Sequence, residues 1–271
     1  MKYLTLLVLC ISSVTIDNYS LQVSNDQKSI WHELITPDLA SSKSFYSNLF
    51  GWTYVDTNSK GFKYTIIYNQ NKVIGGMTEI KSAQNSTWIS AMPLSNEELN
   101  KRIKSVMSNG AKVVLPPVKI PGKGKQVVFE GNMGEEFCLM STNSFSELQD
   151  TSKIDGNWIG IELWSDDPVK SSDFYQNAFD VNTVKSEYDN KPYWSFILNE
   201  TTVAGMLKNP ITNQSSQWVP YIRFTAINSL VSKVKELKGY TLLAPNQKIR
   251  DGKVAIFQDP SGAIFAVQHF N

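Results

Sequence analysis

The sequence predicts an α+β protein made of two tandem βαβββ modules, residues 29–143 and 156–271, joined by a polar linker at 144–155. The main observation is a repeat: the segment 33–77 recurs at 162–206, a constant offset of 129 residues. Self-similarity at a fixed spacing indicates a duplicated structural unit. The matched pairs are Glu33 and Glu162, Asp38 and Asp167, Phe45-Tyr46 and Phe174-Tyr175, Phe50 and Phe179, Gly76-Met77 and Gly205-Met206, Gly110 and Gly239, and Pro116 and Pro245.

Each copy shows the same order of elements. A strand ends at an Asp suited to cap a helix, and the helix that follows has apolar residues on one face. Aromatic, β-rich runs come next, then a second helix stopped by Gly, and finally two strands. The expected ranges are strands at 30–35, 62–68, 73–77, 126–129 and 136–140 with helices from 39 and at 96–109, and strands at 158–164, 194–198, 203–207, 254–257 and 264–268 with helices from 168 and at 228–238.

Composition restricts the class of partner. The chain is 41% hydrophobic and 11% aromatic, which is ample for a packed core. Lys and Arg number 26 against 25 Asp and Glu, without a basic stripe. We therefore expect no nucleic-acid partner, and instead a small molecule that is uncharged or weakly charged.

Residues 1–20 are expected to be an export signal. Lys2 precedes the apolar run 3–11, which is too short to span a bilayer and is typical of a secretory signal; an extra N-terminal strand is the alternative. Leu9-Cys10 also resembles the end of a bacterial lipobox, which would place a lipid anchor at Cys10. We expect a secreted or periplasmic protein with no membrane span and, after cleavage, with Cys138 as its one cysteine.

Three motifs resemble the vicinal oxygen chelate superfamily, which includes glyoxalase I, bleomycin resistance proteins and extradiol dioxygenases. They are Trp31-His32-Glu33-Leu34, then Phe45-Tyr46 followed by Phe50-Gly51-Trp52, and Asp259-Pro260-Ser261-Gly262. The Phe-Gly-Trp version is similar to the two-module, glyoxalase-like branch. The resemblance implies curled mixed sheets with helices outside, paired into a cup-shaped, pseudo-twofold fold with the site inside the cup.

The resemblance also implies a divalent metal held by four side chains, two per module, at fixed distances from the helix-opening and turn Asp residues. Those positions hold Trp31, Cys138, Gly160 and Ala266. These residues do not supply the His, Glu or Gln donors that such an ion needs. No cofactor is therefore predicted, and a displaced divalent metal at Glu33, Glu162 and Gln268 is the alternative.

Alternation along the strands gives a candidate ligand pocket. Its members are Trp31, Glu33, Cys138, Met140, Glu162, Trp164 and Gln268. His32 and His269 are expected on the opposite sheet faces, and Cys138 as a small buried residue rather than a nucleophile. Glu33 and Glu162 are expected either to face a ligand or to accept hydrogen bonds that hold the fold.

Three functions remain open, with catalytic residues unassigned. The favoured one is a binding module that holds a small, partly apolar molecule in a metal-free cup. The second is a metal-dependent lyase or dioxygenase that uses the displaced site. The third is a structural protein whose cup is filled by its own side chains.

Overall fold

Two eight-stranded mixed sheets, one from each half of the chain, form the computed structural model. The structure describes residues 31–59, 62–120, 124–141, 154–188, 191–211 and 214–269. The predicted export signal, the lipobox cysteine Cys10 and most of the predicted linker lie outside these residues. None of the described helices is long and apolar enough to cross a membrane.

The first sheet has the strand order β2-β3-β4-β1-β5-β8-β7-β6. Its elements are β1 (Trp31–Thr36), α1 (Leu39–Phe50), β2 (Thr53–Ser59), β3 (Phe62–Asn69), β4 (Lys72–Glu79), β5 (Thr87–Leu94), α2 (Asn96–Ser108), β6 (Lys112–Ile120), β7 (Gly124–Glu130) and β8 (Glu136–Ser141).

The second sheet repeats this order as β10-β11-β12-β9-β13-β16-β15-β14. Its elements are β9 (Trp158–Ser165), α3 (Pro168–Phe179), β10 (Asn182–Tyr188), β11 (Lys191–Leu198), β12 (Thr201–Lys208), β13 (Gln217–Arg223), α4 (Ile227–Glu236), β14 (Tyr240–Leu243), the short 3₁₀ helix η2 (Arg250–Gly252), β15 (Val254–Gln258) and β16 (Ile264–Gln268).

The predicted α+β class and the duplication are confirmed, and each half proves to contain two βαβββ units rather than one. The sequence analysis omitted β2, β5 and β6 and their counterparts β10, β13 and β14. Strand β6 illustrates why, because it contains Pro116-Pro117, a pair that argues against a strand. Its place at the edge of the sheet tolerates proline, since an edge strand needs fewer ladder hydrogen bonds.

The predicted helix starts are confirmed in both halves. The Asp38 carboxylate accepts a hydrogen bond from the Ser41 N–H at 3.0 Å, and the Asp167 carboxylate accepts one from Lys170 N–H at 3.2 Å. Gly51 ends α1 in the left-handed conformation, with φ of 75°. This conformation costs little for glycine and accounts for the glycine of the Phe-Gly-Trp motif.

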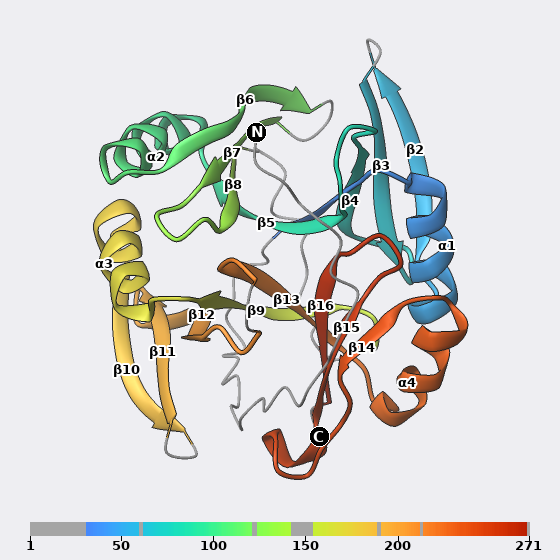
Figure 1. Cartoon of the computed structure of the whole chain (residues 1–271). Helices are drawn as coiled ribbons and strands as arrows, with labels where there is room; N and C mark the ends of the chain where they lie inside the picture. The colour runs from blue at the N-terminus through green and yellow to red at the C-terminus, as the bar shows by residue number, and fades with distance from the viewer. Residues whose placement is uncertain are drawn as a thin grey trace.

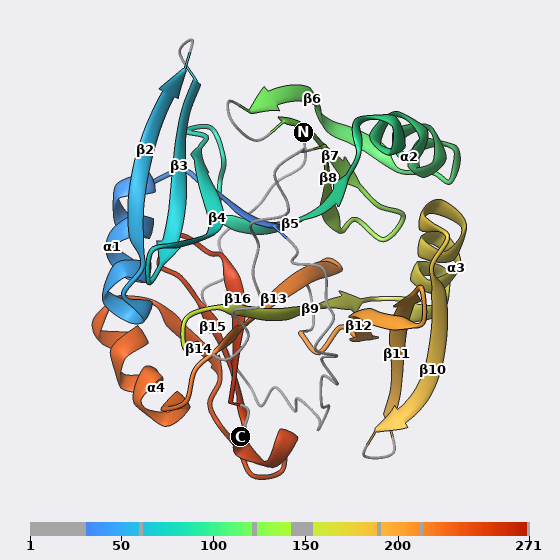
Figure 2. The same cartoon turned by 180° about the vertical axis from the view of Figure 1, so that it is seen from behind.

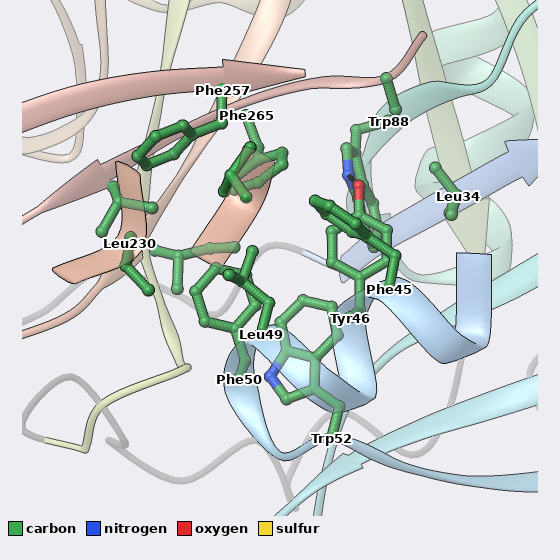
Figure 3. Close-up of a cluster of buried hydrophobic side chains, with 14 of the residues drawn as sticks. Leu34, Phe45, Tyr46, Leu49, Phe50, Trp52, Trp88, Leu230, Phe257 and Phe265 are labelled. Carbon is green, nitrogen blue, oxygen red and sulfur yellow. Dashed lines mark hydrogen bonds between the residues drawn. The ribbon is translucent and has the colours of Figure 1, made fainter. Parts of the chain in front are cut away.

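The helices pack across the two halves. Helix α1 and helix α4 share one buried aromatic cluster, which Figure 3 shows around Tyr46, Trp52 and Phe265. Helices α2 and α3 share a second cluster on the other side of the molecule (Figure 1). These clusters occupy the helix-covered faces of both sheets.

The opposite faces of the sheets form two separate concavities. In Figures 1 and 2 the sheets lie back to back, with β5 and β13 in contact, and they curl away from each other. We call the concave face of the first sheet the first cup and that of the second sheet the second cup. The cups are lined by two further clusters, Trp31, Tyr64, Ile89, Ala91, Val128, Cys138 and Met140 in the first, and Ile159, Trp164, Tyr193, Leu207, Val219, Tyr221, Leu243, Ile249, Val254, Ile256, Ile264 and Ala266 in the second.

Reciprocal hydrogen bonds join the halves. The Tyr46 hydroxyl on α1 donates to Asp259 in the second half at 3.2 Å, and the Tyr175 hydroxyl on α3 donates to Glu135 in the first half at 2.9 Å. Burial raises the pKa of both carboxyls and both phenols. Each helix is thereby tied to the last turn of the other half, which explains why Phe-Tyr occurs in both copies.

Candidate ligand-binding site

The structure distributes the predicted pocket residues between the two cups. Trp31, Glu33, Cys138 and Met140 lie on β1 and β8 of the first sheet, and Glu162, Trp164 and Gln268 lie on β9 and β16 of the second. Each set is brought together within its own cup, but the two sets are not brought together. Glu33 and Glu162 thus occupy matched places in different sheets.

The residues at the four expected metal positions form one cross-strand row in each cup. In the first cup Trp31 pairs with Ala91 and Ala91 with Cys138. In the second cup the same row is Gly160, Tyr221 and Ala266. The rows offer an indole, a phenol, a thiol and methyl groups.

These residues do not fit a metal ion. Burial raises the pKa of Cys138, so that the side chain is a thiol rather than the thiolate a metal would bind. Among the described residues, no group of three or more His, Cys, Asp and Glu side chains could hold an ion.

A buried Glu and Tyr pair occurs in both cups. The Tyr64 hydroxyl donates to Glu33 at 2.6 Å, and the Tyr193 hydroxyl donates to Glu162 at 3.1 Å. Burial raises the pKa of both phenols well above the usual value, so both remain neutral donors. The pair is part of the duplicated framework, because a duplicated fold repeats its structural requirements.

The repeated glycines make room for these tyrosines. A Cβ at Gly76 would overlap the Tyr64 hydroxyl, and a Cβ at Gly205 would overlap that of Tyr193. Strands β4 and β12 run through these glycines, so the backbone approaches each tyrosine hydroxyl closely. Glu33 also accepts hydrogen bonds from Trp31 Nε1 at 3.1 Å and from Thr78 Oγ1 at 2.8 Å.

The second cup adds a buried ion pair that the first lacks in its described part. Arg250 Nη2 lies 2.7 Å from Glu162 Oε1, with the two side chains 5% and 0% exposed. Tyr221 donates a second hydroxyl to Glu162, and the Arg250 guanidinium lies over the Tyr221 ring, 5.3 Å from its centroid. Burial by itself lowers the pKa of Arg250, but the charge of Glu162 outweighs it and raises that pKa. Arg250 is therefore charged.

Three buried polar atoms in the second cup have no hydrogen-bond partner among the residues that the structure describes. They are Trp164 Nε1, Arg250 Nη1 and Gln268 Oε1. Their side chains belong to residues that are 1%, 6% and 4% exposed, respectively. Buried polar groups are normally paired, and an unpaired one costs about 1–3 kcal/mol. Three such atoms in one cup make the second cup the candidate binding site.

The first cup has apolar residues at the positions of two of these three groups. By the repeat offsets Ile35 corresponds to Trp164 and Met140 to Gln268, and the sequence has Pro121 at the offset of Arg250. The Glu, Tyr and Gly framework is thus common to both halves, whereas the unpartnered atoms of Trp164, Arg250 and Gln268 have no equivalent in the described part of the first cup.

His32 lies off the first cup, as expected. It is buried on the helix side of β1, with its ring 4.3 Å from that of Trp158 and Nδ1 3.1 Å from Ser90 Oγ. Burial lowers the pKa of His32 to about 3, so it is neutral. His269 follows β16 and is half-buried.

The sequence analysis missed Tyr193, Tyr221 and Arg250. Tyr193 could have been found, because Tyr64 lies 129 residues before it and shares the repeat. Tyr221 and Arg250 carry no such signal. Arg250 belongs to a short turn, and only the folded chain places it over β13.

Known proteins resemble this chain both in sequence and in structure. No protein-family model matches the sequence. The chain is 24% identical over 256 residues to the anthracycline biosynthesis protein DnrV of Streptomyces peucetius, covering 88% of this chain and 91% of that one. It is 22% identical over 242 residues to the putative glyoxylase CFP32 of Mycobacterium bovis, covering 88% and 92%.

Among solved structures, the Mn(II)-bound glyoxalase from Novosphingobium aromaticivorans aligns with a TM-score of 0.62 and 13% identity, over 90% of this chain and 82% of that one. This likeness concerns the fold. Together with the sequence relatives, it confirms the resemblance seen in the motifs: the chain has the two-module, glyoxalase-like fold of the vicinal oxygen chelate superfamily.

Proposed function

We propose that this chain is an exported, glyoxalase-like protein that binds a small, partly apolar molecule in its second cup, without the usual four-ligand metal centre of the superfamily. The observation that carries the proposal is the set of unpartnered atoms on Trp164, Arg250 and Gln268. A ligand with polar groups would satisfy them, and sites of this kind combine apolar walls with a few placed polar groups.

The walls of the second cup account for the apolar part of the ligand. Aliphatic side chains from five strands and from the approach to η2 surround the polar groups. They are Leu207, Val219, Leu243, Ile249, Ile256 and Ile264. The binding would rest on burial of apolar ligand surface, with the polar groups setting orientation.

The alternative is a metal-dependent lyase or dioxygenase, which the fold shared with a Mn(II)-bound glyoxalase favours. Its displaced site would have to use Glu162, whose carboxylate already accepts hydrogen bonds from two tyrosines and Arg250. A metal there would have to displace the guanidinium. Elemental analysis of the purified protein decides the matter, since one equivalent of Mn, Fe, Ni or Zn would favour the enzyme.

Export rests on the apolar run at 3–11 behind Lys2. Intact-mass analysis of the protein from its native cells tests this part separately. We expect a chain shortened by about 20 residues. A lipid-modified Cys10 would support the anchored form, and an intact Met1 would contradict export.

A thermal-shift screen of small aromatic and aliphatic compounds tests the binding itself. We expect compounds that raise the Tm of the wild-type protein and lose most of that effect in Gln268→Met, because this variant removes one unpartnered atom from the second cup. Gln126→Met is the matched control, since Gln126 is an equally buried glutamine on β7 of the first sheet. A screen without hits, or hits that Gln126→Met and Gln268→Met affect equally, would contradict binding in the second cup.

A further inference from the structure

The charge balance of the second cup restricts the class of ligand. Arg250 and Glu162 are both buried and 2.7 Å apart, so their opposite charges cancel locally. A ligand carboxylate would bring a third charge to this position, and Arg223, the cation that pairs with Gln268 in the strand register, already lies 3.7 Å from Asp155. Burying an unbalanced charge costs several kcal/mol, so a neutral polar group is favoured over an ionised one.

The unpartnered atoms also define which hydrogen bonds the ligand makes. Arg250 Nη1 and Trp164 Nε1 are donors, and Gln268 Oε1 is an acceptor. The ligand must therefore offer a carbonyl-type oxygen together with an N–H or O–H group. A carboxamide satisfies a glutamine side chain in either orientation of the amide, because both groups carry a donor and an acceptor.

The strand register shows how the three side chains are ordered along the floor of the cup. Gln268 at the end of β16 pairs with Val254 at the start of β15, and Arg250 lies in the turn just before that strand. Trp164 lies two residues beyond Glu162 on the same face of β9. The Arg250 guanidinium lies against Glu162 and over the Tyr221 ring, and Tyr221 pairs with Ala266, two residues before Gln268 on the same face of β16. Gln268 pairs with the end of β13 and Trp164 with its start, so the Trp164 donor lies at the other end of the floor.

We infer that the second cup selects a neutral small molecule whose apolar body carries a carbonyl oxygen beside an N–H or O–H donor, as in a carboxamide or a hydroxy-carbonyl compound. This inference rests on the proposed binding function. Its simplest competitor is ordered water, which commonly satisfies buried polar groups. Water alone would leave the cup without preference among ligands of the same shape.

Three probes that share one ring system separate these outcomes: naphthalene-2-carboxamide, naphthalene-2-carboxylate and 2-methylnaphthalene. Titrated into the full chain at pH 7 with tryptophan fluorescence or calorimetry as readout, the carboxamide is expected to bind at least about tenfold more tightly than either of the others. Gln268→Met is expected to weaken carboxamide binding about five- to tenfold and to leave 2-methylnaphthalene unchanged. Gln126→Met in the first cup is expected to alter neither.

Each contrary result points to a different error. A carboxylate that binds as tightly as the carboxamide would overturn the neutral ligand class and leave the proposed function standing. Equal binding of 2-methylnaphthalene would overturn polar recognition, again without touching the function. If the carboxamide fails while the thermal-shift screen finds other ligands that depend on Gln268, this inference alone is wrong. If neither experiment finds a ligand, both proposals are overturned.

Discussion

The two halves of the molecule solve the same structural problems with different residues. At the last turn, the second half has Asp259 and Ala263 where the first has Gly131 and Glu135. In both arrangements one carboxylate is buried, and it accepts a hydrogen bond from the tyrosine on a helix of the other half. A Cβ at Gly131 would overlap the Glu135 carboxylate, so that glycine makes room for the acid four residues later.

In the two cups, different aromatic residues likewise donate to the buried glutamate. In the first, Trp31 donates to Glu33 across a row completed by Ala91. In the second, the aromatic donor is Tyr221 at the position of Ala91, and Gly160 takes the place of Trp31. In these exchanges each cup keeps an aromatic hydrogen-bond donor to its buried glutamate. Arg250, Trp164 and Gln268, in contrast, have no polar counterpart at the corresponding positions of the first half. The difference between halves thus separates residues that hold the fold from residues available for function.

The largest effect is expected at the buried ion pair of the second cup. Arg250→Met would leave the Glu162 carboxylate buried without its cation, and breaking one side of a buried pair costs about 3–5 kcal/mol of unfolding free energy. Urea unfolding measures the loss. The double variant Arg250→Met with Glu162→Gln should recover most of it, because no unpaired charge remains. A double variant as unstable as the single one would show that Arg250 acts through packing instead.

The second effect concerns the helix-side position that holds His32 in the first half and Ile161 in the second. Because burial lowers the pKa of His32 to about 3, the unfolded chain binds a proton there below its usual pKa of 6.5 and the folded chain does not. Stability contributed by neutral His32 is therefore present above pH 6.5 and is lost as the pH falls toward about 3, by up to about 1.4 kcal/mol per pH unit. His32→Ile should flatten this dependence, as followed by unfolding at pH 7 and pH 4.5. An equally steep loss in the variant would assign the acid sensitivity to other groups.

The third prediction tests whether the residues of the last turn can be moved from the second half to the first. Gly131→Asp alone should cost about 1–3 kcal/mol, because its side chain overlaps Glu135. Glu135→Ala alone should also destabilise, since Tyr175 loses its acceptor. The double variant reproduces the arrangement of the second half and should return to within about 1 kcal/mol of wild type. Simple addition of the two single losses would mean that the halves are not interchangeable at this turn.

The sequence predicted the framework well and the site only in part, for physical reasons. The repeat located Glu33, Glu162 and the helix-opening Asp residues, because duplication copies residues with a local structural requirement. Alternation along single strands also placed Trp164 and Gln268 in a cup. It could not show that the two cups face apart, since that depends on how the sheets pack against each other.

Tertiary structure alone reveals the rest of the site. Arg250 reaches Glu162 from a turn 88 residues away in the chain, a contact that no periodicity encodes. The swap of Trp31 for Tyr221 is also invisible in sequence, because the donor moves to a neighbouring strand. Strand pairing had to be known before either could be seen.

The smallest effect is a gain in stability. Gln268→Met gives the second cup the residue that the first cup has at Met140. It also removes a buried oxygen for which the described residues supply no partner. We expect the unfolding free energy of the ligand-free protein to rise by about 1 kcal/mol, while ligand binding falls. Gln126→Met, the same substitution in the first cup, leaves the three unpartnered atoms in place and should bring no such gain. Because a residue kept for the fold loses stability when replaced, a loss of more than about 1 kcal/mol in Gln268→Met would identify Gln268 as structural. A gain in unfolding free energy together with a loss of ligand binding would instead show that Gln268 lowers the stability of the second half and serves ligand binding.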